Sequence, residues 1–346
     1  MTGGRGGRGG RGGRSPAGAE YRYQPAWWLP GGHLQTLWGK FAPMAFVPPA
    51  TVERFEMADG DRVELHTVGS PDASRRLLLL HGLEGSIRSH YVRRILAMAA
   101  TRNWGATLMV FRGCGSTPNI ARRFYHSGET SDLNHIFHTL RARWPTAEWH
   151  CLGVSLGGNV LLKWLGETGG AGGVRRAAAV SVPFDLAASA RHISRGFARV
   201  YDRNFLRTLR RKALAKLALH PGLFDREALV RARSVYDFDD AVTAPVHGFV
   251  DAEDYYARSS SIAFLSGIRV PTLLLSAKDD PFLPSEALAR AAIEANRNPA
   301  LRVEFHSRGG HVGFVAGLVP GRPRYYAERR SFQFFDERVD TSPVSG

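Results

Sequence analysis

The feature that most constrains the fold of this chain is an alternation of short apolar runs with longer amphipathic stretches from residue 76 onward. Short apolar runs bounded by turn residues indicate strands that are covered on both faces, and the amphipathic stretches between them indicate helices. Consecutive strand–helix–strand units build a parallel sheet with helices on both sides. The sequence therefore predicts an α/β fold with a mostly parallel, doubly wound sheet.

The individual elements follow from the spacing of their apolar residues. Strands are expected at 76–80, 106–111, 148–154, 175–182, 270–276 and 301–306, and helices at 89–101, 132–143, 156–164, 286–296 and 325–338. Two earlier runs, 52–57 and 62–67, are separated by Asp59-Gly60, a pair that is typical of β-hairpin turns. We therefore expect an antiparallel hairpin before the parallel part of the sheet.

The segment between the strands at 175–182 and 270–276 interrupts this rhythm because it is much longer than the other connections. Its apolar residues recur at three- and four-residue spacing, and arginines fill the opposite faces, which indicates amphipathic helices. We expect a helical cap, inserted at about 187–262, over the carboxyl ends of the strands. This cap precedes the strand that is expected to carry a catalytic acid. With the cap included, we expect residues 20–346 to form one domain.

Positive charge is concentrated in two parts of the chain. Lysine and arginine outnumber aspartate and glutamate by 46 to 31, which gives a formal net charge of +15. Residues 1–19 form a glycine-rich tail with four arginines, and 191–216 contain nine basic residues and one acidic residue. We expect the tail to be disordered because it has almost nothing apolar to bury. The basic cap suggests contact with an anionic membrane or an acidic acyl donor, and we do not expect specific binding of nucleic acid.

Several other patterns limit the chemistry of the chain. Its two cysteines, Cys114 and Cys151, are too few for a disulfide framework or a four-cysteine zinc site. The apolar runs are strand-sized and none approaches the ~18 residues of a membrane span, and no secretory signal is recognisable. No phosphate loop, dinucleotide fingerprint or H-E-x-x-H pattern occurs. We expect a cytoplasmic protein that needs neither a metal nor an organic cofactor.

The sharpest local motif is Gly153-Val154-Ser155-Leu156-Gly157, which lies between an expected strand and an expected helix. A G-x-S-x-G motif in this context is typical of a tight turn that presents a nucleophilic serine above the edge of a sheet. The glycines allow the strand and the helix to approach each other closely. The sequence therefore predicts Ser155 as a nucleophile.

A serine nucleophile needs a base, because its hydroxyl is almost fully protonated at neutral pH. Among thirteen histidines, His311 is the best candidate. It lies in the glycine-rich stretch 309–314, directly after the last expected strand of the sheet, where an imidazole can turn toward the serine. We therefore predict His311 as the general base.

The acid that orients the histidine is expected after another strand. Asp279 and Asp280 follow the strand at 270–276, and because adjacent side chains point in different directions, only one can face the imidazole. We favour Asp280, since Pro281 rigidifies the turn that follows it. Asp279 is the alternative, and Asp185, after the preceding strand, is a third candidate. The chain order serine, aspartate, histidine is that of the α/β hydrolases.

An oxyanion hole requires two backbone N–H groups near the nucleophile. The N–H of Leu156, directly after Ser155, is one expected donor. The second is expected in the glycine-containing loop after the strand at 76–80, with Leu83 as the donor. The neighbouring Glu84 would oppose an oxyanion unless it is paired, so we interpret it as a salt-bridged anchor of the loop.

As a set, these residues and further motifs resemble the YheT-like branch of the α/β hydrolases, relatives of short- and medium-chain esterases and ethanol acyltransferases. The similar stretches are 33–38, 82–86, 112–115, 125–130, 153–159, 183–186, 254–256, 279–282 and 310–314. The resemblance spans about 20–335 and implies a carboxylic-ester hydrolase with the triad Ser155, Asp280 and His311. The tail is foreign to this pattern. After Arg112-Gly113-Cys114 the chain also lacks the Ser-Gly-Glu type of turn that is usual in the family.

The leading hypothesis is a serine hydrolase of the carboxylesterase type that forms an acyl-enzyme with short- to medium-chain acyl esters. An alternative enzyme would use the same triad to transfer the acyl group to an alcohol. A non-enzymatic alternative is a protein that binds RNA or another polyanion through the tail and the basic cap.

Overall fold

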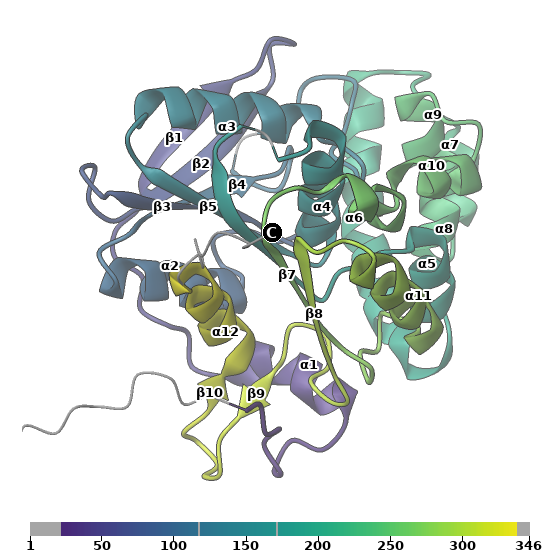
Figure 1. Cartoon of the computed structure of the whole chain (residues 1–346). Helices are drawn as coiled ribbons and strands as arrows, with labels where there is room; N and C mark the ends of the chain where they lie inside the picture. The colour runs from purple at the N-terminus through teal and green to yellow at the C-terminus, as the bar shows by residue number, and fades with distance from the viewer. Residues whose placement is uncertain (1–21, 117, 171, 338–346) are drawn as a thin grey trace, which may run out of the picture.

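An eight-stranded sheet runs through the centre of the protein (Figure 1). The computed structural model describes residues 22–116, 118–170 and 172–337, so the predicted tail at 1–19 lies outside the described residues. The strands are β1 (Thr51–Glu56), β2 (Arg62–Val68), β3 (Arg75–Leu80), β4 (Gly105–Val110), β5 (Glu148–Val154), β6 (Val174–Val180), β7 (Thr272–Ala277) and β8 (Leu301–His306). Their order is β1-β2-β4-β3-β5-β6-β7-β8. β1, β2 and β4 pair antiparallel, and all the other neighbours pair parallel.

Helices cover both faces of the sheet, as the sequence predicts. In β3, Leu78 and Leu80 contribute to one buried core, and Leu77 and Leu79 contribute to the other, because successive side chains of a strand point to opposite faces. The first core includes residues of α3 (Ser131–Arg143), α4 (Leu156–Thr168) and α11 (Ser285–Asn296). The second includes residues of α2 (His90–Thr101) and α12 (Tyr326–Asp336). The fold is therefore a doubly wound α/β fold.

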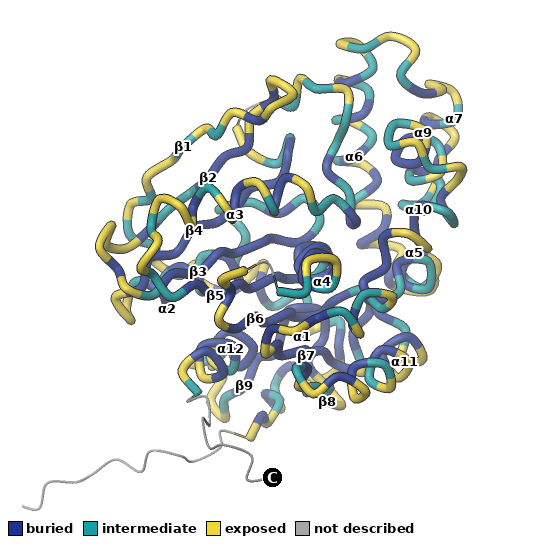
Figure 2. The backbone as a smooth tube through the Cα atoms, turned by 45° about the horizontal axis from the view of Figure 1, so that its top comes forward, coloured by how far each residue is buried: buried dark blue, intermediate teal, exposed yellow. Residues whose placement is uncertain are grey.

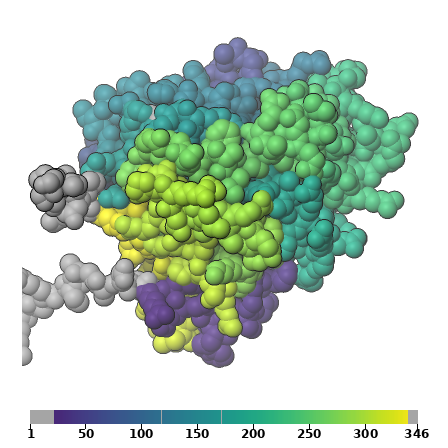
Figure 3. All heavy atoms as spheres, turned by 45° about the vertical axis from the view of Figure 1, so that its right-hand side comes forward, coloured from purple at the N-terminus to yellow at the C-terminus, as the bar shows by residue number. Residues whose placement is uncertain are grey.

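One helix was not expected from the sequence. α1 (Gly32–Phe41) lies in the aromatic segment before the hairpin, and its N-cap, Gly31, makes no side-chain capping hydrogen bond. It has no acidic residue in its first turn, so the usual signals of a helix start are missing. Figure 3 shows that this N-terminal part of the chain, in purple, lies beside the yellow C-terminal part. There, β9 (Val315–Ala316) pairs with β10 (Arg324–Tyr325).

The chain between β6 and β7 is almost entirely helical. It contains α5 (Leu186–Ile193), α6 (Arg199–Leu219), α7 (Arg226–Arg231), α8 (Val235–Phe238), α9 (Ala244–His247) and α10 (Ala252–Ser259), with short 3₁₀ or π segments at Gly196–Ala198, Asp239–Thr243 and Ser261–Gly267. We call residues 186–259 the cap. The cap has apolar clusters of its own, and in Figure 2 its outer helices carry many exposed residues while the sheet is mostly buried. None of the helices in the described ranges has both the length and the apolar character needed to cross a membrane.

A buried arginine joins the hairpin to the loop after β4. The side chain of Arg112 is fully buried, and its guanidinium contacts Asp61 at 3.0 Å, Asp59 at 3.1 Å and both carboxylate oxygens of Asp132 at 2.6 and 2.9 Å. Burial opposes ionisation of Asp59, but hydrogen bonds from Arg123 and Arg112 outweigh it and lower the pKa of that carboxyl to about 2. The buried charges of Arg112, Asp61 and Asp132 are tolerated because each has a charged, hydrogen-bonded partner.

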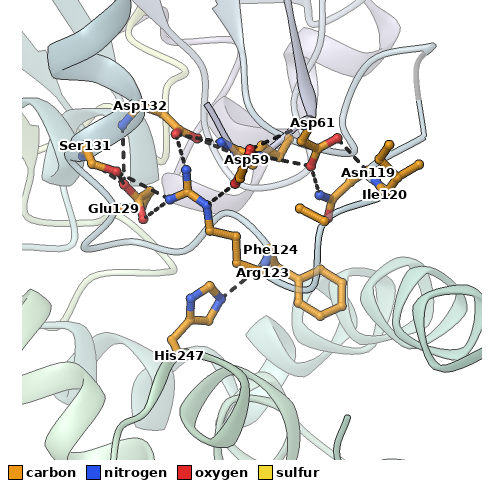
Figure 4. Close-up of polar contacts among 12 residues, drawn as sticks. Asp59, Asp61, Asn119, Ile120, Arg123, Phe124, Glu129, Ser131, Asp132 and His247 are labelled. Atoms are coloured by element: carbon orange, nitrogen blue, oxygen red, sulfur yellow. Dashed lines mark hydrogen bonds and ion pairs between the residues drawn. The ribbon is translucent and has the colours of Figure 1, made fainter. Parts of the chain in front are cut away.

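The same network holds the loop that faces the cap. In Figure 4, Arg123 lies among Asp59, Glu129 and Asp132. Asp61 accepts a hydrogen bond from the Asn119 amide, and His247 of α9 accepts one from the backbone N–H of Phe124. The ammonium group of Lys216 on α6 donates to the backbone carbonyl and the side-chain oxygen of Asn119. The hairpin, the loop at 112–128 and the cap are thus joined by one connected set of polar contacts.

We predict that replacing Arg112 by methionine lowers the free energy of unfolding by about 3–5 kcal/mol, because it leaves the buried carboxylate of Asp61 without a cation and removes two hydrogen bonds from buried Asp132. Urea unfolding measures this change. As a control, replacing Arg143, which makes an exposed ion pair with Glu53, by alanine should cost less than about 1 kcal/mol. Equal losses in the two variants would contradict a structural role for the buried network.

Candidate active site

Ser155 forms a strained turn between β5 and α4. Its φ of 55° lies in the left-handed region, which non-glycine residues rarely adopt. The turn is possible because its neighbours lack side chains. A Cβ atom at Gly157 would lie 2.5 Å from the carbonyl oxygen of His81, and one at Gly153 would lie 2.5 Å from the carbonyl oxygen of Gly157. The Ser155 side chain is thereby presented at the carboxyl end of the sheet.

His311 reaches Ser155 from the loop that follows β8. Its Nε2 atom lies 2.9 Å from Ser155 Oγ, and its ring stacks on Phe282 with 4.1 Å between the ring centroids. The backbone N–H of His311 donates to Thr36 Oγ1 of α1 at 2.8 Å. The loop can make this turn because Gly310 has a φ of 60°. Helix α1, which the sequence did not predict, therefore helps to hold the imidazole.

Of the three candidate acids, the structure brings Asp280 against His311. Asp280 Oδ2 lies 2.8 Å from His311 Nδ1, and its other oxygen accepts a hydrogen bond from the backbone of Phe282. Asp279 instead accepts from the backbone N–H of Gly310 at 2.9 Å, and burial raises the pKa of its carboxyl. Asp185 caps α5 and forms an ion pair with Arg290. Neither Asp279 nor Asp185 makes a hydrogen bond with the imidazole among the described residues.

The two expected oxyanion donors have N–H groups without an acceptor in the described parts of the chain. Leu156 begins α4, so its N–H has no partner within the helix. In the loop after β3, Gly82 N–H donates to Tyr91, and Gly85 N–H donates to Gly82, but the N–H of Leu83 has no acceptor. A Cβ atom at Gly82 would lie 3.1 Å from Ser155 Cβ, so this loop passes close to the serine.

Glu84 points away from this role and toward the cap. Its backbone has a φ of 55°, and its carboxylate forms an ion pair with Lys212 of α6 at 2.6 Å. Tyr125 donates a hydrogen bond to the same carboxylate at 2.8 Å. These are the contacts of a loop anchor, which agrees with the interpretation from the sequence.

Two cavities meet beside Ser155. The first, which we call the nucleophile cavity, has a volume of about 110 Å³ and contains Ser155 and His311. Its walls are mostly apolar side chains of α5 and α6 together with Phe282 and Leu283. The second, the α6 cavity, has a volume of about 300 Å³ and lies between the inner face of α6 and the loop at 112–128. Residues that line both are Leu83, Ser127, Leu156, Val235 and Asp239.

Sequence reasoning did not find the residues of the cap that line these cavities. Asp239 is the clearest example, because it lies in an Asp-Asp pair, and such pairs are common on exposed helix surfaces. Its position depends on how the cap folds back over the sheet, and no local motif records that. Within the described ranges, no group of three or more histidine, cysteine, aspartate or glutamate side chains is arranged to hold a metal ion.

Comparison with known proteins agrees with the fold that the sequence predicts. Residues 75–317 match the alpha/beta hydrolase fold family. YheT of Escherichia coli (strain K12), which carries a provisional esterase name, is 37% identical over 86% of this chain and 88% of that protein. The monoacylglycerol lipase of Saccharomyces cerevisiae is 34% identical over 75% of this chain and 59% of the yeast protein. Human phospholipase ABHD3 is 28% identical over 98% of this chain and 84% of that protein.

Solved structures show the same fold at low sequence identity. A Pyrococcus furiosus esterase superposes with a TM-score of 0.52 at 14% identity, over 78% of this chain and 91% of that one. An acylaminoacyl peptidase superposes with a TM-score of 0.54 at 12% identity, over 84% of this chain and 41% of that one. At such identities the likeness establishes the fold alone. The family match and the similarity to YheT go further: the chain belongs to the α/β hydrolases, in the YheT-like branch that its sequence motifs resemble.

Proposed function

We propose that the protein is a serine hydrolase of the carboxylesterase type, with Ser155 as nucleophile, His311 as general base and Asp280 as the acid that orients the histidine. The observation that carries this proposal is the continuous hydrogen-bonded chain from Ser155 Oγ through His311 to Asp280, with distances of 2.9 and 2.8 Å. Each group lies at the end of a different segment, so the chemistry arises only in the folded chain. The esterase and lipase names of its relatives support ester hydrolysis.

The reaction proceeds in two steps. Ser155 Oγ attacks the ester carbonyl while His311 Nε2 takes the hydroxyl proton, and the free N–H groups of Leu83 and Leu156 stabilise the oxyanion. His311 then gives the proton to the leaving alcohol, and the acyl group stays on Ser155. Water attacks this acyl-enzyme with His311 again acting as base, and the carboxylic acid is released. Asp280 holds the imidazole in the tautomer that carries its proton on Nδ1.

The shape of the nucleophile cavity supports a short- to medium-chain acyl group. The cavity is small, at about 110 Å³, and apart from Ser155, His311 and a few polar groups it is lined by apolar side chains. An acyl chain is apolar, so it gains by leaving water for such a cavity. The α6 cavity is larger and contains Glu84 and Lys212, so it suits the alcohol part of the ester better.

We predict that Ser155→Ala lowers kcat/KM for p-nitrophenyl butyrate roughly 10⁴-fold or more, because no other group supplies the nucleophile. Asp280→Asn should lower it roughly 10⁴-fold, because the histidine then takes the wrong tautomer. Asp279→Asn serves as the matched control and should have a far smaller effect. Full activity of Ser155→Ala would refute the proposal, and equally small losses at both aspartates would redirect the search for the acid to Asp185.

We further propose that the outer face of α6 contacts an anionic membrane surface. Arg199, Arg203, Arg207 and Arg211 follow one another at four-residue intervals and are exposed. Like charges at this spacing repel, and none of the four has a carboxylate partner within the described residues. Phe197, beside this stripe, is 59% exposed. A row of unpaired arginines next to an exposed aromatic side chain is typical of helices that bind anionic lipid.

We predict that changing Arg203, Arg207 and Arg211 together to glutamine weakens binding to phosphatidylserine-containing vesicles roughly 100-fold, since each basic residue contributes about 1 kcal/mol. Vesicle co-sedimentation measures the binding. The control changes three exposed arginines outside the cap, Arg54, Arg62 and Arg308, to glutamine and removes the same charge. If both triple variants bind equally well, the α6 face is not the membrane contact.

A further inference from the structure

A carboxylate of the cap lies where the two cavities meet. Asp239 lines both the nucleophile cavity and the α6 cavity. It is the first residue of the π-helical segment Asp239–Thr243, which continues directly from α8. Single π-helical turns often occur at functional sites, because the extra residue changes the direction of the side chains around it. Here Asp239, the first residue of the segment, lines the cavity that contains Ser155 and His311.

The contacts of Asp239 leave it without a cation. Its Oδ1 atom accepts a hydrogen bond from the Thr243 hydroxyl at 2.6 Å, and its Oδ2 atom accepts one from the Tyr256 hydroxyl at 2.7 Å. No lysine, arginine or histidine of the described residues lies within ion-pair distance of it. Each carboxylate oxygen can accept two hydrogen bonds, so each retains one unused site.

A carboxylate with neither full hydration nor a cation costs free energy, and a ligand that donates a hydrogen bond to it would offset that cost. Asp239 is partly buried, so its carboxylate loses part of its hydration, and the usual compensation is a positively charged partner. Burial, with the negative charge of Asp202 nearby, raises the pKa of Asp239 to about 6. Most of the other side chains that line the nucleophile cavity are apolar. A polar acceptor kept in such a cavity fits a substrate that brings its own hydrogen-bond donor.

We propose that Asp239 binds a free hydroxyl group of the substrate, so that the preferred substrates are partial esters of polyols rather than simple alkyl esters. The proposal rests on the proposed ester hydrolysis and names the alcohol part of its substrate. The acyl chain occupies the nucleophile cavity, and the polyol extends past Leu83 and Leu156 toward the α6 cavity. Asp239 accepts the hydrogen bond at the boundary.

The charges around the α6 cavity favour a hydroxyl over an ionic group. Arg112, Lys212 and Lys216 line this cavity against the carboxylates of Glu84 and Asp239, so a substrate ammonium group would meet more positive than negative charge there. A substrate carboxylate or phosphate would be repelled by Asp239 itself, and the two lysines that could attract it already have partners, Lys212 in Glu84 and Lys216 in Asn119. A neutral hydroxyl avoids both repulsions. It can also donate to the Asp239 carboxylate the hydrogen bond that water would otherwise provide.

The test compares glycerol monobutyrate with propyl butyrate, which has the same carbon skeleton but no free hydroxyl. We expect Asp239→Asn to lower kcat/KM for glycerol monobutyrate roughly 10- to 100-fold, the range of a hydrogen bond to a charged group. Turnover of propyl butyrate by the same preparation should stay within about threefold of the unchanged protein, which also shows that the variant is folded.

The matched control is Asp202→Asn, which changes a more deeply buried carboxylate of the cap. Asp202 accepts a hydrogen bond from the backbone of Val235 and lines neither cavity. At pH 8, where Asp239 is ionised whether or not Asp202 carries its charge, this change should leave the ratio of the two rates unaltered. A proportional loss with both esters, or no loss with either, in Asp239→Asn would overturn the proposal, and so would a selective loss of butyrylcholine hydrolysis. Failure of the proposed function is distinct, because the unchanged protein would then hydrolyse neither ester.

Discussion

The backbone of Ser155 is held in a conformation that its own side chain disfavours, and the rest of the site is arranged around it. Its φ of 55° persists because β5 and α4 are each fixed by the buried core, and because backbone atoms of His81 and Gly157 occupy the space where glycine side chains would be. The strain therefore falls on one residue and is offset by the packing of two elements. What results is a hydroxyl that stands clear of the sheet.

The groups around that hydroxyl come from distant parts of the chain. A parallel sheet places the carboxyl ends of β3, β5, β7 and β8 along one edge, so loops far apart in sequence reach a common point. The loop after β3 supplies Leu83, the loop after β7 supplies Asp280 and the loop after β8 supplies His311. α1 then fixes the position of the histidine through Thr36.

Much of the fold and part of the site could be predicted from the sequence, because they depend on patterns among residues that are close together in the chain. Strands with apolar residues on both faces, the glycines around Ser155 and a glycine-rich loop at His311 are short-range signals, and each corresponds to a feature of the fold. The preference for Asp280 over Asp279 had a local argument in Pro281, but which carboxylate meets the imidazole depends on the path of the whole loop. α1 lacks capping signals, and the contacts of Arg112 and Asp239 join segments that are far apart in sequence. Such contacts leave no periodicity in the chain.

The central claim is that Ser155 is a nucleophile activated by His311, and a fluorophosphonate probe tests it most directly. The probe reacts with serine hydroxyls that are activated in this way, and mass spectrometry of the digested protein identifies the labelled residue. The account predicts one adduct, on Ser155, with labelling greatly slowed when His311 is replaced by alanine. Absence of labelling in the folded protein, or an adduct on a different residue, would contradict it.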